Sequence, residues 1–293
     1  MKTLKHLISS RIFKEPSEDN VPVFVIRPSK GWISLLNFRE LRHYKDLLYI
    51  LIWREIKVRY KQTTIGIGWA VLQPFLAMVI FSIFFGRLAK IPSEGIPYPI
   101  FSYCALLPWQ FFSKALTEAS TCLVTERVMV TKIYFPRLLL PTSIVLAGLL
   151  DFGIAFLLLL GMIAFYGITL SWTALVAPLF LILAIFAALG ISYWLSALDA
   201  IYRDVRYTLP LLTQLWLFAS PIVYPSSMVP EAWRTIYGIN PMVSVIEGFR
   251  WSLLGQKPPD PAMFTVSCVT VGLIFVIGLI YFRRTERTLA DKV

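Results

Sequence analysis

The sequence predicts an all-α polytopic membrane protein with six transmembrane helices, an amphipathic interfacial helix before the first, and a broken re-entrant segment before the last. Between Trp69 and Phe282, long and nearly charge-free apolar stretches alternate with short basic connections. About 20 apolar residues in a helix cover the roughly 30 Å hydrocarbon core of a bilayer. The chain is 57% hydrophobic and 15% charged, whereas soluble domains carry about 25% charged residues. These observations exclude a soluble enzyme.

Residues 1–38 form a polar lead that we expect to stay in the cytoplasm. Met1–Asp19 is charged throughout and has no apolar run of the signal-peptide type, so we expect no cleavage. A short extended run is predicted at 21–26. Basic residues outnumber acidic ones before the first apolar stretch, and such a bias is the ordinary signal of a cytoplasmic flank.

An amphipathic helix is predicted over 39–61, directly before the first apolar stretch. The apolar side comprises Leu41, Tyr44, Leu48, Leu51 and Ile52, and the charged side comprises Arg42, Asp46 and Lys57. A basic amphipathic helix before a span usually lies flat in the interface, with its apolar face among acyl chains. Because Arg59 falls on the apolar side, we expect the helix to bend or end near it.

The predicted spans are 67–87, 103–123, 138–165, 172–198, 208–225 and 262–282. The second is the weakest because it contains Lys114 and Glu118, which can pair one helical turn apart; a shorter, tilted or partly re-entrant helix is the alternative. An even number of spans puts both termini on one side, and the basic residues of the connections favour the cytoplasm for that side. The spans form one domain, 67–285, and 286–293 is a cytoplasmic tail.

Residues 226–261 are too polar to cross a bilayer and too apolar for a free loop. Pro225, Pro230, Pro241 and Gly238 break this part of the chain, and a helical stripe from Met242 to Leu253 runs beside Glu247 and Arg250. Irregular backbone at membrane depth survives only where protein or water satisfies it. We therefore expect this segment to dip into the outer leaflet against other helices, with a short surface helical hairpin as the alternative.

Three charged residues lie well inside the predicted spans, namely Lys114, Glu118 and Asp151, whereas Arg87 is the last residue of the first span. Polar groups at this depth are the default functional candidates, and an ionised carboxylate there costs about 2.5–3.5 kcal/mol on insertion scales. Asp151 therefore faces a wet cavity, pairs with a base on a neighbouring helix, or stays protonated. No further acid or histidine lies at a similar depth, which favours a structural pair over proton coupling.

Aromatic residues gather in the first and fifth spans: Phe75, Phe81, Phe84, Phe85, Trp216, Phe218 and Tyr224. Flat rings offer broad contact at low entropic cost, so they could line a path for a ligand with apolar sugar faces. It is at least as good an interpretation that these aromatic side chains only contact lipid.

Two connections on the predicted cytoplasmic side combine mixed charge with aromatic residues, a composition typical of interfaces. They are Val124–Arg137 and Asp199–Tyr207, and either could also be an ordinary solvated loop. Their candidate residues are Glu126, Arg127, Lys132, Tyr134, Phe135, Arg137, Tyr202, Arg203, Asp204 and Arg206.

The sequence has no phosphate-binding loop, no His-Glu-x-x-His and no nucleophile elbow. Its histidines, His6 and His43, both lie before the first span. Cys104, Cys122 and Cys268 have no metal-ligand spacing and are expected to pack as small apolar residues. Active transport by this chain would therefore need a partner that hydrolyses ATP.

Four sequence runs carry a resemblance to a known family. The run from Trp53 to Thr63 (Trp-Arg-Glu-Ile-Lys-Val-Arg-Tyr-Lys-Gln-Thr), Leu72-Gln73-Pro74, Leu107-Pro108-Trp109 and Tyr202-Arg203-Asp204-Val205 occur in order along the chain. Together with the helix before the first span and the broken segment before the last, they closely resemble ABC-2 type permeases that export O-antigen, capsule or teichoic acid.

The resemblance implies a homodimer paired with two copies of a separate ATP-binding subunit in the cytoplasmic (inner) membrane of a bacterium. ATP and Mg would bind that partner, and no cofactor would bind this chain. The two connections would be coupling helices, the first and fifth spans would line a conduit for a lipid-linked polysaccharide, and 226–256 would supply an outer gate. The gate candidates are Trp233, Tyr237, Met242, Ile246 and Phe249.

Two alternatives remain at this point. A drug- or lipid-efflux permease of the same superfamily would share the topology without needing a wide sugar-compatible path. An intramembrane glycosyl- or acyltransferase would need a base or metal-binding carboxylates at the membrane surface. The available acids, Asp199 and Asp204, are five residues apart and so do not share a helical face.

Overall fold

The structure is a computed structural model that describes residues 44–61, 66 and 68–292, all within the unit Phe38–Val293. The predictions for the lead at 1–38, the extended run at 21–26, both histidines and the first residues of the interfacial helix lie outside the described residues. Every regular element in the described part is a helix, in agreement with the all-α prediction.

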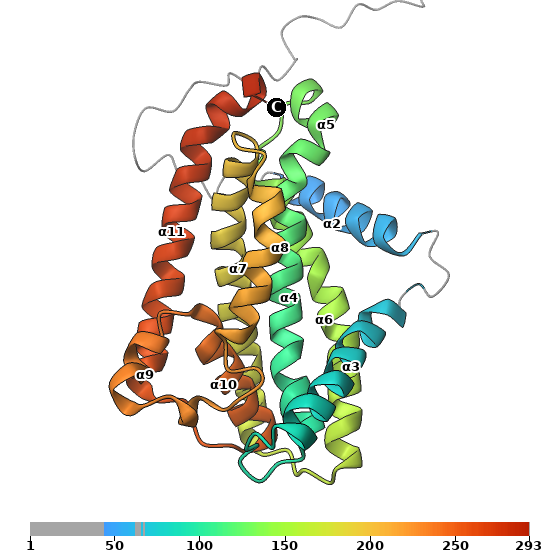
Figure 1. Cartoon of the computed structure of the whole chain (residues 1–293). Helices are drawn as coiled ribbons and strands as arrows, with labels where there is room; N and C mark the ends of the chain where they lie inside the picture. Colours follow the sequence, from blue (N-terminus) through green and yellow to red (C-terminus); the bar gives the residue numbers. More distant parts are fainter. Residues whose placement is uncertain (1–43, 62–65, 67, 293) are drawn as a thin grey trace, which may run out of the picture. The chain divides into compact units, whose positions relative to one another are not determined.

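The helices follow one another along the chain with short connections (Figure 1). They are α2 (Lys45–Tyr60), α3 (Gly68–Phe81), the π-helical η3 (Ser82–Leu88), α4 (Tyr98–Thr125), α5 (Arg127–Lys132), α6 (Leu139–Phe165), the 3-10 turn η4 (Trp172–Val176), α7 (Ala177–Asp199), α8 (Val205–Phe218), η5 (Ser226–Met228), α9 (Glu231–Tyr237), α10 (Pro241–Leu254) and α11 (Pro261–Lys292).

Four helical stretches in the described part are long and apolar enough to cross a membrane. They are Gly68–Leu88, Leu139–Phe165, Trp172–Asp199 and Pro261–Glu286, and they match the first, third, fourth and sixth predicted spans. The protein is therefore a multi-pass membrane protein. The count of six spans stays a prediction, because α4 carries two charges and α8 is short.

The predicted fifth span, 208–225, is wrong in its bounds. The helix begins at Val205 and ends at Phe218, so it has 14 residues, and at about 1.5 Å per residue it is shorter than the roughly 30 Å core. Pro221 lacks the amide that would continue the helix. The apolar residues that follow, Ile222 and Val223, are instead buried inside the unit.

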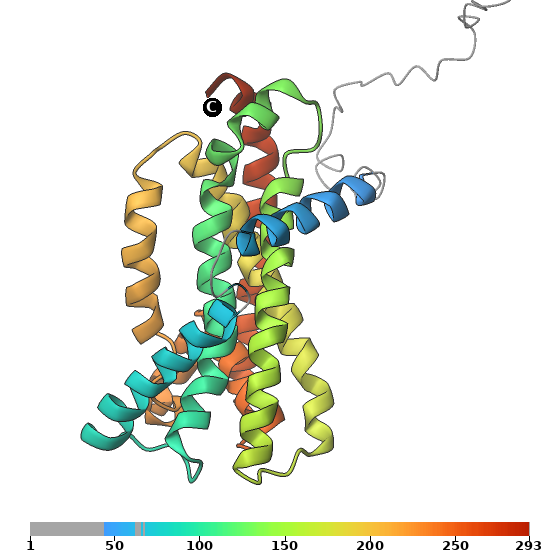
Figure 2. The same cartoon turned by 90° about the vertical axis from the view of Figure 1, so that its right-hand side faces the viewer.

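The bundle is built around α4, which is buried along most of its length and packs against α3, α6, α7, α8 and α10. Figure 1 shows α5, the α7–α8 connection and the end of α11 at one end of the bundle, here called the α5 end. It shows α9 and α10 at the opposite end. In Figure 2, α8 stands at the side of the bundle, and most of its side chains are exposed.

Helices α7 and α11 cross in backbone contact at Gly190 and Gly278. A Cβ atom built on Gly278 would lie 2.0 Å from the Gly190 carbonyl oxygen, and one on Gly190 would lie 2.7 Å from the Cα of Phe275. Neither position has room for a side chain. Small residues let membrane helices approach this closely and gain van der Waals contact.

The segment before α11 is a core element. Asn240 caps α10 by accepting a hydrogen bond from the Met242 amide, Pro241 occupies the first turn, and Gly255 ends the helix at φ 69°. Every residue from Pro241 to Arg250 is buried, against α4, α7 and α11. This burial argues against the surface hairpin; whether the segment re-enters the bilayer stays a prediction.

The predicted interfacial helix is α2, and its apolar face is covered by protein rather than by lipid as predicted. Leu51 is 3% exposed and, with Leu48, packs on the bundle, where α2 contacts α6 (Figure 2). The face predicted to lie among acyl chains therefore packs on protein. Other apolar side chains of α2 are exposed instead: Tyr49, Ile50, Trp53 and Val58. The helix ends at Tyr60, next to Arg59 as expected.

Candidate functional site

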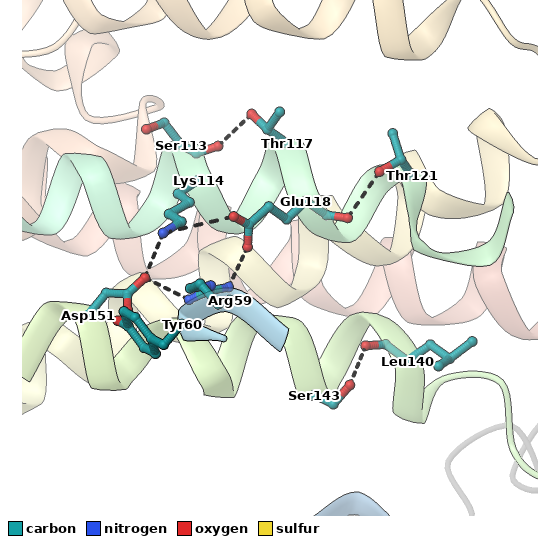
Figure 3. Close-up of polar contacts among 10 residues, drawn as sticks. All are labelled: Arg59, Tyr60, Ser113, Lys114, Thr117, Glu118, Thr121, Leu140, Ser143 and Asp151. Atoms are coloured by element: carbon teal, nitrogen blue, oxygen red, sulfur yellow. Dashed lines mark hydrogen bonds and ion pairs between the residues drawn. The ribbon is translucent and has the colours of Figure 1, made fainter. Parts of the chain in front are cut away.

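A network of five polar side chains joins the end of α2 to the middle of α4 and α6 (Figure 3). We call Arg59, Tyr60, Lys114, Glu118 and Asp151 the charge network. Arg59 Nη1 donates to Asp151 Oδ2 at 2.6 Å, and Lys114 Nζ donates to the same oxygen at 2.7 Å. Tyr60 donates to the other carboxylate oxygen, and Arg59 Nη2 donates to Glu118. Asp151 thus accepts from three donors.

The charges of the network balance. It holds the cations Arg59 and Lys114 and the anions Glu118 and Asp151. Lys114 and Glu118 also approach each other at 3.9 Å, as their spacing on α4 predicted. Burial and the hydrogen bond to Asp151 raise the pKa of the Tyr60 phenol, so Tyr60 stays protonated and donates.

Of the alternatives open for Asp151, the structure shows the pair with a base on a neighbouring helix, Lys114, and the carboxylate also lines a cavity. Sequence reasoning missed Arg59 as the second partner. The sequence did indicate that Arg59 needs a partner inside the protein, because it is a basic residue on the apolar side of the amphipathic helix. A buried charge at a helix end needs a partner, and the helix ends where Arg59 can reach one.

The network forms one wall of a cavity of about 390 Å³ among α2, α3, α4, α6 and α8. Besides the charged groups, the lining includes aromatic rings, side-chain amides and hydroxyls: Trp69, Gln73, Gln110, Phe111, Ser113, Thr117, Phe152 and Thr213. Its volume lies within the range of about 300–1,000 Å³ common to small-molecule sites. It can therefore hold a ligand that needs both polar and flat apolar contacts.

A second ion pair links α2 to the start of α5. Arg54 donates to both carboxylate oxygens of Glu126, at 3.0 and 2.7 Å, and to Glu55 at 2.7 Å. Paired donors of this kind fix orientation as well as distance. Because Arg54 and Arg59 lie on one helix, α2 connects the α5 end directly to the charge network.

The structure places both candidate coupling connections at the α5 end (Figure 1). Of the candidate residues, six are exposed: Arg127, Lys132, Tyr134, Tyr202, Arg203 and Asp204. The others have internal contacts: Phe135 is buried, Arg137 donates from its backbone and side chain to Glu286, and Arg206 binds Asp199 at 2.9 Å. Contact with a partner protein stays a prediction for all of them.

The two acids considered for a transferase site do not form a pair. Asp199 is 1% exposed and accepts two hydrogen bonds from Arg206, at 3.1 and 2.9 Å. Asp204 is exposed. Asp199 therefore holds the α7–α8 connection in place, and this arrangement offers no joint carboxylate chemistry.

The candidate conduit residues differ in their surroundings. Phe75, Phe84 and Phe218 are exposed, whereas Phe81 and Phe85 are partly buried and contact each other edge to face at 5.5 Å. The remaining two have polar partners. Trp216 donates to Asn240 at 3.0 Å and packs on Phe112 at 5.2 Å, and Tyr224 pairs with Tyr237 at 3.0 Å. Their role in a conduit stays a prediction.

The candidate gate residues lie mostly inside the unit. Met242, Ile246 and Phe249 are at most 1% exposed, Tyr237 is partly buried and Trp233 is exposed. Their gating role is likewise a prediction. The segment also contains a buried ion pair, Glu247 with Arg250, whose further contacts the sequence did not reveal.

Arg250 is completely buried in α10. Its guanidinium lies 3.6 Å above the centre of the Phe101 ring, donates to the Ile222 carbonyl at 2.9 Å, and pairs with Glu247 at 3.3 Å. Glu247 in turn accepts from the Ser226 amide at 3.2 Å. Arg250 and Glu247 thus attach the irregular chain after α8 to α10 and α4.

A family model and the similar known proteins all indicate a transporter permease. The model of the ABC-2 type transporter family matches residues 46–254. The chain is 30% identical to the O-antigen export system permease protein RfbA of Myxococcus xanthus, over 85% of this chain and 96% of that protein. It is 28% identical to the O-antigen export system permease protein RfbA of Klebsiella pneumoniae, over 84% of this chain and 94% of that protein. It is 25% identical to the polysialic acid transport protein KpsM of Escherichia coli, over 76% of this chain and 89% of that protein. The chain belongs to the ABC-2 type transporter family.

Proposed function

We propose that this chain is the permease subunit of an ATP-driven exporter that moves a lipid-linked polysaccharide, such as O-antigen, across the bacterial cytoplasmic membrane. The observation that carries the proposal is its likeness, over 85% of its length, to a protein named as an O-antigen export permease. The polar cavity of about 390 Å³ among membrane helices supports it, because a polysaccharide needs hydrogen-bonding groups along its path.

In this proposal two copies of the chain work with two copies of a separate ATP-binding subunit, which holds ATP and Mg. The α5 end and both termini face the cytoplasm, in keeping with the basic residues of the connections. The exposed residues of Val124–Arg137 and Asp199–Tyr207 contact the ATP-binding subunits. Movement of α5 then passes through the Arg54–Glu126 pair to α2 and, through Arg59, to the charge network.

This route predicts the effect of a charge swap. Arg54→Glu should lower export, because the new carboxylate would lie beside those of Glu55 and Glu126. The double variant Arg54→Glu/Glu126→Arg restores an ion pair of opposite polarity and should recover much of the export. The pair is partly exposed, so the change in stability should stay within about 1 kcal/mol. Lys45→Glu on the exposed side of α2 is the control. Equal export by all four proteins would contradict the route.

The function is tested by deleting the gene from its host and locating the surface polysaccharide. Full-length glycan should accumulate inside the cytoplasmic membrane and return to the surface on complementation. Loss of glycan without accumulation would point to synthesis instead. An unchanged surface together with altered drug resistance would support an efflux permease.

A further inference from the structure

We infer that the cavity beside the charge network is a subsite for sugar units of the transported glycan, with Trp69, Gln73 and Gln110 as its contact residues. The inference rests on the proposed function and adds a binding site to it. None of these three residues is among the conduit or gate candidates that the sequence suggested.

The first argument is the unused hydrogen-bonding capacity of the cavity wall. Gln73 on α3 and Gln110 on α4 both line the cavity, and neither side-chain amide bonds another residue in the described part of the chain. An amide offers donors and acceptors together. Sugar hydroxyls also donate and accept, so such groups match them better than a purely cationic or acidic wall would.

The second argument is charge. Both cations of the network already hold carboxylates, at 2.6 and 2.7 Å from Asp151, and the network has no net charge. A phosphate or carboxylate entering the cavity would meet repulsion from Asp151 and Glu118, whose charges already neutralise both cations. The wall therefore favours the neutral, hydroxyl-rich part of the substrate over the phosphate of its lipid carrier.

The third argument is position and shape. The cavity is lined by Trp69 on α3 and Thr213 on α8, the helices of the first and fifth predicted spans, which by the family resemblance would line the conduit. The Trp69 side chain is 51% exposed, which leaves a flat ring able to stack on the apolar face of a sugar. A volume of about 390 Å³ admits one or two sugar units rather than a long chain.

Photocrosslinking in the host tests the subsite with the full exporter in its own membrane. p-Benzoylphenylalanine replaces Gln110 in one strain and Leu157 in the other; Leu157 is 67% exposed on α6 and lies outside the cavity. The Gln110 position should yield an adduct that binds antibody to the host glycan, and the Leu157 position should not. Adducts of equal yield, or lipid adducts without glycan at the Gln110 position, would overturn the inference.

A second measurement does not depend on a bulky side chain. Gln73→Leu/Gln110→Leu preserves approximate volume and removes both amides. Export per molecule of permease in the membrane should fall about tenfold, equivalent to about 1.4 kcal/mol. Wild-type export by this variant, in a host where gene deletion does accumulate glycan, would refute the subsite alone. Absence of accumulation in the deletion strain would refute the proposed function.

Discussion

The Asp151→Asn variant is expected to lose about 3 kcal/mol of its free energy of unfolding, because removing one partner of a buried charge cluster leaves the others uncompensated. Asp151 accepts from Arg59, Tyr60 and Lys114, and its side chain is only 12% exposed. After the substitution two cations would share one carboxylate, Glu118. The unfolding transition of the purified protein in detergent measures the loss.

A matched control and a rescue separate this effect from general damage. Asp46→Asn removes the same charge from the exposed first turn of α2 and should cost less than about 1 kcal/mol, the usual contribution of an acid at a helix N-terminus. Lys114→Met/Asp151→Asn removes one cation with the anion and should recover part of the loss, since Arg59 keeps Glu118. Equal stability of wild type and the Asp151→Asn variant would show that the network does not hold α2, α4 and α6 together.

The second large effect concerns the crossing of α7 and α11. Gly278→Ala places a Cβ atom 2.0 Å from the Gly190 carbonyl oxygen, so the two helices must separate. Overpacking of a well-packed contact costs about 1–3 kcal/mol, and a backbone neighbour cannot rotate away as a side chain can. We expect a loss near the upper end of that range, measured by thermal unfolding in detergent.

Gly272→Ala is the matched control, because it lies on the same helix and its Cβ would meet no atom within 4 Å. Alanine is favoured over glycine in a helix by roughly 0.5–1 kcal/mol. The control variant should therefore be as stable as wild type or slightly more stable. A Gly278→Ala variant that behaved like its control would mean that the helices do not cross in contact.

The spans with unbroken apolar character were predictable because length and hydropathy alone determine them. The fifth was misplaced for the same reason: Ile222 and Val223 extend the apolar run, and hydropathy cannot distinguish burial among helices from burial in lipid. Pro221 was the local signal for the end of α8, and apolar continuity outweighed it.

The candidate site was predictable only in its local parts. The spacing of Lys114 and Glu118 fixes their pairing, because one helical turn separates them. The partners of Asp151 depend on how α2, α4 and α6 pack, which no local pattern records. The same holds for Arg54 with Glu126 and for Arg250 over Phe101, whose members lie far apart in sequence.

Transport by inverted membrane vesicles tests the central claim most directly. The vesicles come from the host, contain the exporter, and carry lipid-linked glycan on their outer, originally cytoplasmic face. With ATP and the wild-type chain, the glycan should become protected from an added glycosidase, and the protection should be absent without ATP or without this chain. Glycan that stays fully digestible in the presence of ATP, the partner ATPase and intact wild-type chain would contradict the account.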